Sequence, residues 1–171
     1  MAKLAAIEMG DALSKQYGHK IINIMPTNMY GPNDNFSENN SHVIPGLIFR
    51  LHKTKQENVD TFTVWGTGDP KREFLHVDDL TSAISFIIEN DHEPDLINVG
   101  TGEEVKISEL VYLIKEIIGY KGDVVFDSNM PDGNPRKLLD SSRIQTLGWS
   151  SSIKLEDGLK DTYSWYLDNQ V

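Results

Sequence analysis

Short apolar runs alternate with amphipathic helical patterns along the whole chain, and this alternation is what most constrains the fold. Runs rich in β-branched residues, namely Ile21–Met25, Thr61–Trp65 and Leu96–Gly100, predict buried strands. Between them, apolar residues recur at spacings of three and four, which is the period of a helix. Alternating strands and helices favour an α/β fold with short, partly parallel strands.

The helical patterns carry start and stop signals, with one exception. Residues 1–18 have one apolar face and end at Gly18, which suits a left-handed C-cap, but no Ser, Thr, Asp or Asn precedes the first turn. The missing start signal raises the expectation that the chain begins inside a longer helix. The other predicted helices, with their expected N-caps, are 44–51, 78–90 (Asp78 or Asp79), 108–119 (Ser108), a short helix after Asp140, and 155–167.

Stretches rich in Pro, Gly and Asn separate these elements and are predicted to be loops. Residues 26–41 form the longest, and a loop of this length without structure of its own is more often functional than not. Residues 66–74 and 130–137 are two further loops with clear turn residues. Because ligands of α/β folds bind at loops that follow strands, we expect the site among these three segments.

Composition argues against several classes of function. The net charge of −10 disfavours a nucleic-acid or anionic-membrane surface, and no apolar segment has membrane-spanning length. A chain without cysteine has no disulfide, thiolate zinc site or cysteine nucleophile. No pair of histidines stands four residues apart on a helix, so no metal site is predicted. No secretory signal is expected, because Glu8 and Asp11 interrupt the first apolar positions, and a cytoplasmic location fits.

Three basic clusters stand out against this acidic background. They are Arg50 with Lys53, Lys71 with Arg72, and Arg136 with Lys137. Guanidinium forks pair with phosphate oxygens, so convergent clusters could hold a diphosphate, each charge-assisted bond contributing about 1.5–3 kcal/mol. Charge alone fits solvated surface residues somewhat better, and both interpretations stay open at this point.

Six segments carry a family resemblance, in family order and with family-like spacing over nearly the whole chain. They are MPTNMYGPNDNF, NSHVIPGLIFR, VWGTGDPKREFLHVDDL, INVGTG, KGDVVFD and PDGNPRKLLD. The chain resembles the C-terminal part of the GDP-L-fucose synthase family, within the extended short-chain dehydrogenases/reductases. The resemblance implies the last helix and strand of a Rossmann-type parallel sheet in residues 1–36. It implies a small mixed α/β nucleotide-sugar domain in residues 37–171, with room for short return segments to the first domain.

The resemblance also explains the missing helix start. The family carries Tyr-x-x-x-Lys on a long helix, and Lys3 matches the Lys, so the Tyr would lie before Met1. At this spacing both side chains share one helical face, where the Lys charge favours the phenolate and the ammonium can hold the nicotinamide ribose. The family's glycine-rich NADP motif, catalytic Ser and acid/base Cys would also lie upstream. We therefore expect a fragment that is inactive alone.

The remaining site residues are implied by the resemblance as well. His42 is the acid/base candidate for epimerisation at C3 and C5, and it and Lys3 would both contact the cofactor NADP(H). Backbone groups of Pro26, Thr27, Asn28 and Met29 would face its carboxamide. The residues expected to bind the GDP-sugar are Arg50 and Arg72 on the diphosphate, Trp65 packed against the ligand, Asp132 as an acceptor, and Lys137.

For three of these residues a purely structural interpretation is also open. They are Lys3 as a solvated lysine, Trp65 as a core residue and Asp132 as a turn-forming residue. His76 is expected to be structural, and His52 to lie on the surface. Two other functions remain open: an epimerase or reductase that takes UDP- or dTDP-sugars, and a non-catalytic nucleotide-sugar-binding module. The parent protein is expected to form a homodimer through the Lys3 helix, whose apolar face would be partly uncovered in this chain.

Overall fold

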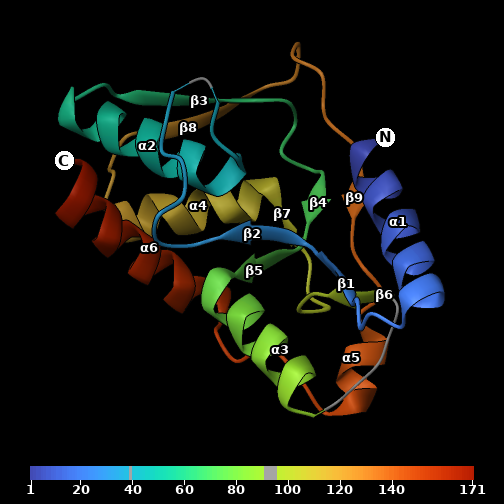
Figure 1. Ribbon diagram of the computed structural model, residues 1–171. Coiled ribbons are helices and arrows are strands. Elements are labelled where there is room, and N and C mark those ends of the chain that lie inside the picture. Colours follow the sequence, from blue (N-terminus) through green and yellow to red (C-terminus); the bar gives the residue numbers. More distant parts are fainter. Residues whose placement is uncertain (39, 91–95) are drawn as a thin grey trace.

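Short strands, most of them in parallel pairs, lie beside six helices in the computed structural model, which describes residues 1–38, 40–90 and 96–171 (Figure 1). This mixed α/β architecture confirms the predicted fold class. In chain order the elements are α1 (Ala2–Tyr17), β1 (Asn23–Pro26), β2 (Asn28–Tyr30), α2 (Val43–Gln56), β3 (Thr61–Trp65), β4 (Lys71–Arg72), β5 (Phe74–His76), α3 (Val77–Glu89), β6 (Leu96–Val99), β7 (Val105–Lys106), α4 (Ile107–Ile118), β8 (Asp123–Asp127), β9 (Arg136–Lys137), α5 (Ser142–Leu147) and α6 (Leu155–Gln170).

The strands pair across long stretches of sequence. β1 pairs with β6, β2 with β5 and β3 with β8, all in parallel. β4 lies at the centre of a three-stranded sheet, antiparallel to β7 and parallel to β9. In the β4–β9 register, Lys71 lies opposite Arg136 and Arg72 lies opposite Lys137. Since successive side chains on a strand point to opposite faces, this register sorts the basic residues into two pairs.

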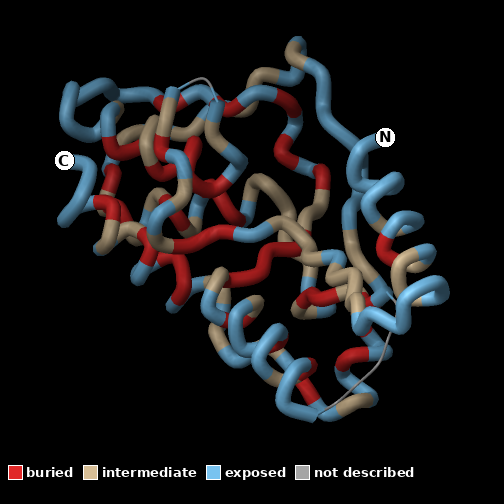
Figure 2. The backbone as a smooth tube through the Cα atoms, in the orientation of Figure 1, coloured by how far each residue is buried: buried red, intermediate tan, exposed pale blue. Residues whose placement is uncertain are grey.

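Two hydrophobic clusters stabilise the chain. The larger lies among α2, β3, α4 and α6, where Leu51, Leu110 and Leu159 are almost completely buried. The smaller joins β6, α3 and α5, and Ile24 of β1 packs against it. Burying one such side chain contributes about 1.5–3 kcal/mol. The upper left of Figure 2 shows the dense buried region of the larger cluster. The boundary predicted after residue 36 remains a prediction.

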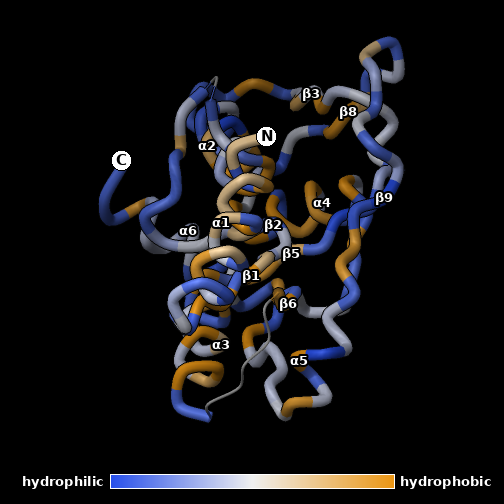
Figure 3. Tube along the Cα trace, turned by 45° about the vertical axis from the view of Figure 1, so that its right-hand side comes forward, coloured by the Kyte–Doolittle hydropathy of each residue, from blue (hydrophilic) through white to orange (hydrophobic). Residues whose placement is uncertain are grey.

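Helix α1 contributes little to either cluster. Gly10 is its one buried residue, and a side chain at this position would meet Ile21 at 3.0 Å. Met9 and Tyr17, two positions of the predicted apolar face, are each 61% exposed, and Figure 3 shows tan and orange positions along α1. The predicted uncovered apolar face is therefore confirmed. Gly18 ends α1 in the left-handed conformation, with φ 69°, as predicted.

The loop predictions were partly wrong. Asn28–Tyr30, inside the predicted loop 26–41, forms β2, because β5 supplies a parallel partner. Lys71–Arg72 and Arg136–Lys137, inside the other two predicted loops, form β4 and β9 by pairing with each other. Such strands depend on remote partners, so local turn residues hide them in the sequence.

The predictions for two helix N-caps and for the exposure of one histidine were also wrong. Helix α3 is capped by His76, whose Nδ1 accepts the Asp78 N–H at 3.3 Å, and this bears out a structural role for His76. Helix α4 begins after Lys106 instead of at Ser108. His52 is 8% exposed, because α6 covers it and the Tyr163 hydroxyl lies 2.9 Å from its Nδ1. None of the helices in the described ranges combines the length and apolar character that crossing a bilayer requires.

Candidate functional site

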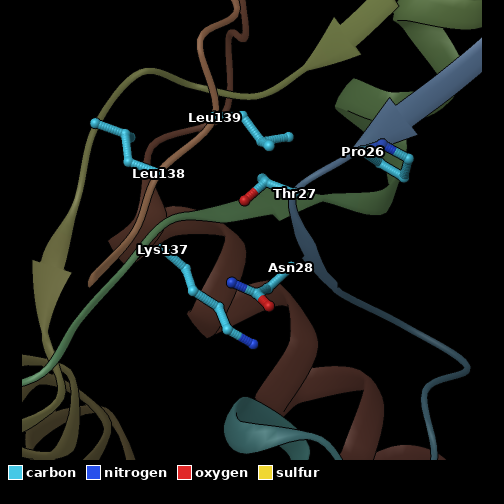
Figure 4. A pocket seen from close by; sticks show the side chains of 6 residues that line it. All are labelled: Pro26, Thr27, Asn28, Lys137, Leu138 and Leu139. Carbon is cyan, nitrogen blue, oxygen red and sulfur yellow. The ribbon is translucent and has the colours of Figure 1, made fainter. Parts of the chain in front are cut away.

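A pocket of about 360 Å³ opens between the end of β1 and the segment that follows β9 (Figure 4). One wall is Pro26, Thr27 and Asn28, and the other is Lys137, Leu138 and Leu139. The pocket lies where the parallel strand β1 ends, which is where α/β folds bind ligands. Four of these residues were predicted as site residues from the sequence and are brought together here, whereas Leu138 and Leu139 were missed.

The first wall is held by hydrogen bonds to the β4–β5 junction. The Thr27 hydroxyl and the Asn28 side-chain amide donate to the Glu73 carbonyl at 3.3 and 2.8 Å. The Thr27 N–H donates to the Val99 carbonyl at 3.0 Å, and Pro26 has no N–H. Neither Pro26 nor Thr27 therefore has a free N–H for a ligand. Of their backbone groups, only the carbonyl oxygens are left for the expected contact. Met29 is 43% exposed and does not line the pocket.

On one face of the β4–β9 pair, both cations are paired with Glu104. Its two oxygens lie 2.9 Å from Lys71 Nζ and 2.6 Å from Arg136 Nε. Hydrogen bonds from Arg136 and then from Lys71 hold the pKa of the Glu104 carboxyl below its ordinary value. Lys71 and Arg136 are therefore held in an ion cluster with Glu104, which is neither the free solvated charge nor the ligand contact expected from the sequence.

The other face carries Arg72 and Lys137, side by side in register. Among the residues that the structure describes, neither is paired with a carboxylate, and Arg72 Nη1 donates to the Lys71 carbonyl at 2.7 Å. Figure 4 shows the Lys137 side chain extending beside Asn28 at the pocket. Two adjacent cations without an acidic partner form a place where an anion can bind, despite the net negative charge of the chain.

Further along the same segment, Asp132 is joined to the end of β3. Its two carboxyl oxygens accept the Thr67 N–H at 2.9 Å and the Thr67 hydroxyl at 2.7 Å. Trp65 is 68% exposed, which excludes the core interpretation of this tryptophan. A side chain at Gly133 would lie 3.1 Å from the Arg72 guanidinium, so the cation passes close to this turn.

These contacts arrange four of the five predicted substrate residues in one path, and Arg50 is the exception. This path leads from Trp65 through Asp132 and the Arg72–Lys137 pair to the pocket. The path joins an exposed aromatic ring, a carboxylate acceptor and a pair of cations. No single small anion touches both ends of such a path, whereas an elongated ligand with a central charged group would.

Arg50 and His42 lie apart from the pocket lining. Arg50 on α2 is partly buried, its Nε donates to the Gly46 carbonyl at 3.3 Å, and its guanidinium lies 5.6 Å from the Phe62 ring centroid. Burial lowers the pKa of Arg50 from its ordinary value. His42 is exposed at the N-cap position of α2, and its side chain makes no capping bond.

Lys3 lies on the first turn of α1, exposed to solvent. Gly10 packs near Asn23, and the chain reverses direction between α1 and β1 (Figure 1). Lys3 itself does not line the pocket.

Residues 1–100 match the NAD dependent epimerase/dehydratase family. The chain is 50% identical over 171 residues to "Probable GDP-L-fucose synthase 1" of Oryza sativa subsp. japonica, covering 100% of this chain and 52% of that protein. It is 49% identical over 179 residues to the GDP-L-fucose synthase of Escherichia coli K12, covering 99% and 56%. A GDP-L-fucose synthetase from Naegleria fowleri bound to NADP superposes with a TM-score of 0.89 at 27% identity, covering 98% and 55%. The chain thus spans about half the length of these relatives.

Proposed function

Because the chain belongs to the NAD dependent epimerase/dehydratase family, we propose that it supplies the nucleotide-sugar side of a GDP-L-fucose synthase. The parent enzyme would convert GDP-4-keto-6-deoxy-D-mannose to GDP-L-fucose by 3,5-epimerisation and NADPH-dependent reduction at C4. One observation carries this proposal: Arg72 and Lys137 lie side by side without an acidic partner among the described residues, next to the pocket. A nucleotide sugar has its diphosphate in the middle, so this arrangement suits it.

The path of residues suggests how the ligand would lie. Its keto-sugar would enter the pocket, its diphosphate would pair with Arg72 and Lys137, and its nucleoside would pack on the exposed face of Trp65. Asp132 would accept hydrogen bonds from ligand hydroxyl or base N–H groups with the lone pairs that Thr67 leaves free. Arg50 is proposed as a further diphosphate ligand, and it would have to give up its bond to Gly46.

The residues present fit one end of NADP(H) only. The wall of Pro26, Thr27 and Asn28 suits the nicotinamide end, whereas this sequence has no glycine-rich loop for the pyrophosphate. The bound cofactor would supply the hydride for C4. The chain itself would orient the keto-sugar in the pocket, hold the ribose through the Lys3 ammonium, and move protons at C3 and C5 through the His42 imidazole.

The fragment interpretation is part of the proposal and has a direct test. Hydride transfer needs an oriented cofactor, so the purified chain mixed with NADPH and the keto-sugar should show no oxidation of NADPH. Clear turnover would contradict it. A cytoplasmic location and, for the parent protein, a homodimer through the Lys3 helix belong to the same proposal.

The relatives do not favour a non-catalytic binding module, and the upstream coding sequence distinguishes such a module from an enzyme. The enzyme proposal requires a Tyr four residues before Lys3 and a glycine-rich motif further upstream. An upstream sequence that contains neither would favour the module. An enzyme that takes UDP- or dTDP-sugars would keep both features, so ligand preference has to separate it from a GDP-sugar enzyme.

A further inference from the structure

Glu73 stands between β4 and β5, and its side chain is completely buried, with 0% exposure. Acidic side chains are rarely buried to this degree without a cationic partner. Among the residues that the structure describes, no Lys, Arg or His forms an ion pair with it, and its neighbour Arg72 belongs to the open basic pair. The burial of Glu73 therefore needs another explanation.

Its partners are groups on both sides of the pocket. One carboxyl oxygen accepts the Leu139 N–H at 3.0 Å, and the other accepts the Gly102 N–H at 2.8 Å. The backbone carbonyl of Glu73 accepts the Thr27 hydroxyl and the Asn28 amide. One residue thus bonds to Leu139 in one wall of the pocket and to Thr27 and Asn28 in the other.

The fold leaves space for this carboxyl group. A side chain at Gly100 would overlap its Oε1 and would lie 2.9 Å from its Cδ, so a glycine here allows the group to approach the backbone. Lys137 lies two residues before Leu139 on the same wall. Displacement of the Leu139 wall would therefore also displace one of the two unpaired cations.

We propose that Glu73 is a positioning residue that sets the width of the pocket by holding the Leu139 wall against the Thr27–Asn28 wall. Its effect on a ligand rests on the proposed function, in which this pocket receives the sugar end of a nucleotide sugar. Glu73 does not line the pocket itself, and it acts through Leu139 and Lys137.

Two variants loosen this bridge, and a third serves as a matched control. Glu73→Gln keeps the size but replaces one acceptor oxygen by an NH₂ group, and Gly100→Ala pushes the carboxyl away without changing Glu73. Asp79→Asn is the control, because Asp79 is also buried, at 2%, and accepts the Ser152 N–H and hydroxyl at 3.0 Å, outside the pocket lining. Amide hydrogen exchange of the chain, followed by NMR, reports the Leu139 N–H directly.

We expect Leu139 to exchange about tenfold faster or more in Glu73→Gln and in Gly100→Ala, since each weakens a buried hydrogen bond to a carboxylate. In Asp79→Asn, the exchange rate of the Leu139 amide, divided by the rate of the buried α4 amides, should be the same as in wild type. Equal exchange of Leu139 in wild type and both bridge variants would overturn the proposal. So would an acceleration of the same size in the control.

Titration with GDP-mannose gives the second readout. We expect Glu73→Gln to weaken binding about tenfold or more, and Asp79→Asn to change it less than about threefold. Wild-type affinity in Glu73→Gln would overturn the positioning role. A wild-type chain that binds no GDP-mannose, but whose Leu139 protection depends on Glu73, would contradict the proposed function and still support the bridge between the two walls.

Discussion

Arg72 and Lys137 lie opposite each other on the parallel strands β4 and β9, while their sequence neighbours Lys71 and Arg136 lie opposite each other and bond to Glu104. The same four-residue ladder therefore has one face whose cations are paired with a carboxylate and one face whose cations are not. The alternation of side chains along a strand makes this separation unavoidable once the register is set.

Removal of the basic face should abolish most anion binding. We expect Arg72→Ala and Lys137→Ala each to lower the affinity for GDP-mannose about tenfold or more, because a hydrogen bond to a charged group is worth about 1.5–3 kcal/mol. Lys71→Ala is the control, since Lys71 bonds to Glu104, and it should change the affinity less than about threefold. Calorimetric titration at fixed salt measures all three. Equal losses in the three variants would show that the two faces do not differ in function.

The Glu104 cluster should make stability depend on acid. Hydrogen bonds from Arg136 and Lys71 lower the pKa of Glu104 below its ordinary value of 4.5, so the unfolded chain binds this proton more readily. The stabilisation is present above pH 4.5 and is lost as pH falls through the lowered pKa. In urea, the free energy of unfolding should therefore be higher for wild type than for Glu104→Gln at pH 7, and this gap should narrow in acid. A gap that stays constant from pH 7 to pH 3 would contradict this.

Because of His52, the stability of the chain should show a second acid-sensitive step, at a higher pH than the step due to Glu104. Burial, and then the charge of Lys55, lower the pKa of His52 below its ordinary value of 6.5. Its contribution to stability is therefore present above pH 6.5 and is lost as pH falls through the lowered pKa. Thermal unfolding of His52→Gln should lack this step. His42→Gln is the control, because His42 is exposed, and its profile should follow that of wild type. A wild-type step that persists in His52→Gln would assign it to another group.

The uncovered face of α1 should cause self-association. Met9 and Tyr17 lie on this face and are each 61% exposed, so Met9→Glu with Tyr17→Glu should change the free energy of unfolding by no more than about 0.5 kcal/mol each. The same double variant should lower the concentration-dependent association of the chain, measured by sedimentation velocity. A wild-type chain that stays monomeric at the highest concentration tested would contradict the expectation.

Much of the fold could be predicted because its signals are local. β3 and β8 coincide with the runs TFTVW and DVVFD, whose β-branched and aromatic residues favour strands in any context. Gly18 and Gly119 end α1 and α4 at the predicted positions, with φ 69° and 71°. These elements need no knowledge of what packs against them.

The rest depends on remote contacts that no local pattern encodes. β2 is a strand because β5 lies beside it, and the basic residues divide into two pairs because β4 and β9 adopt one register out of several. Glu73 was missed because a Glu between Arg and Phe is typical of a solvated residue, and its partners lie 29 to 66 residues away. The Gly100 that leaves room for it would have been the one available signal, and it is a weak one.

The most direct test of the central claim is a calorimetric titration of the chain with GDP-mannose and with UDP-glucose, repeated on the Arg72→Ala, Lys137→Ala double variant. The account predicts saturable binding of GDP-mannose, weaker binding of UDP-glucose, and loss of both in the double variant. Binding that is equal for the two sugars, absent for GDP-mannose, or unchanged in the double variant would contradict it.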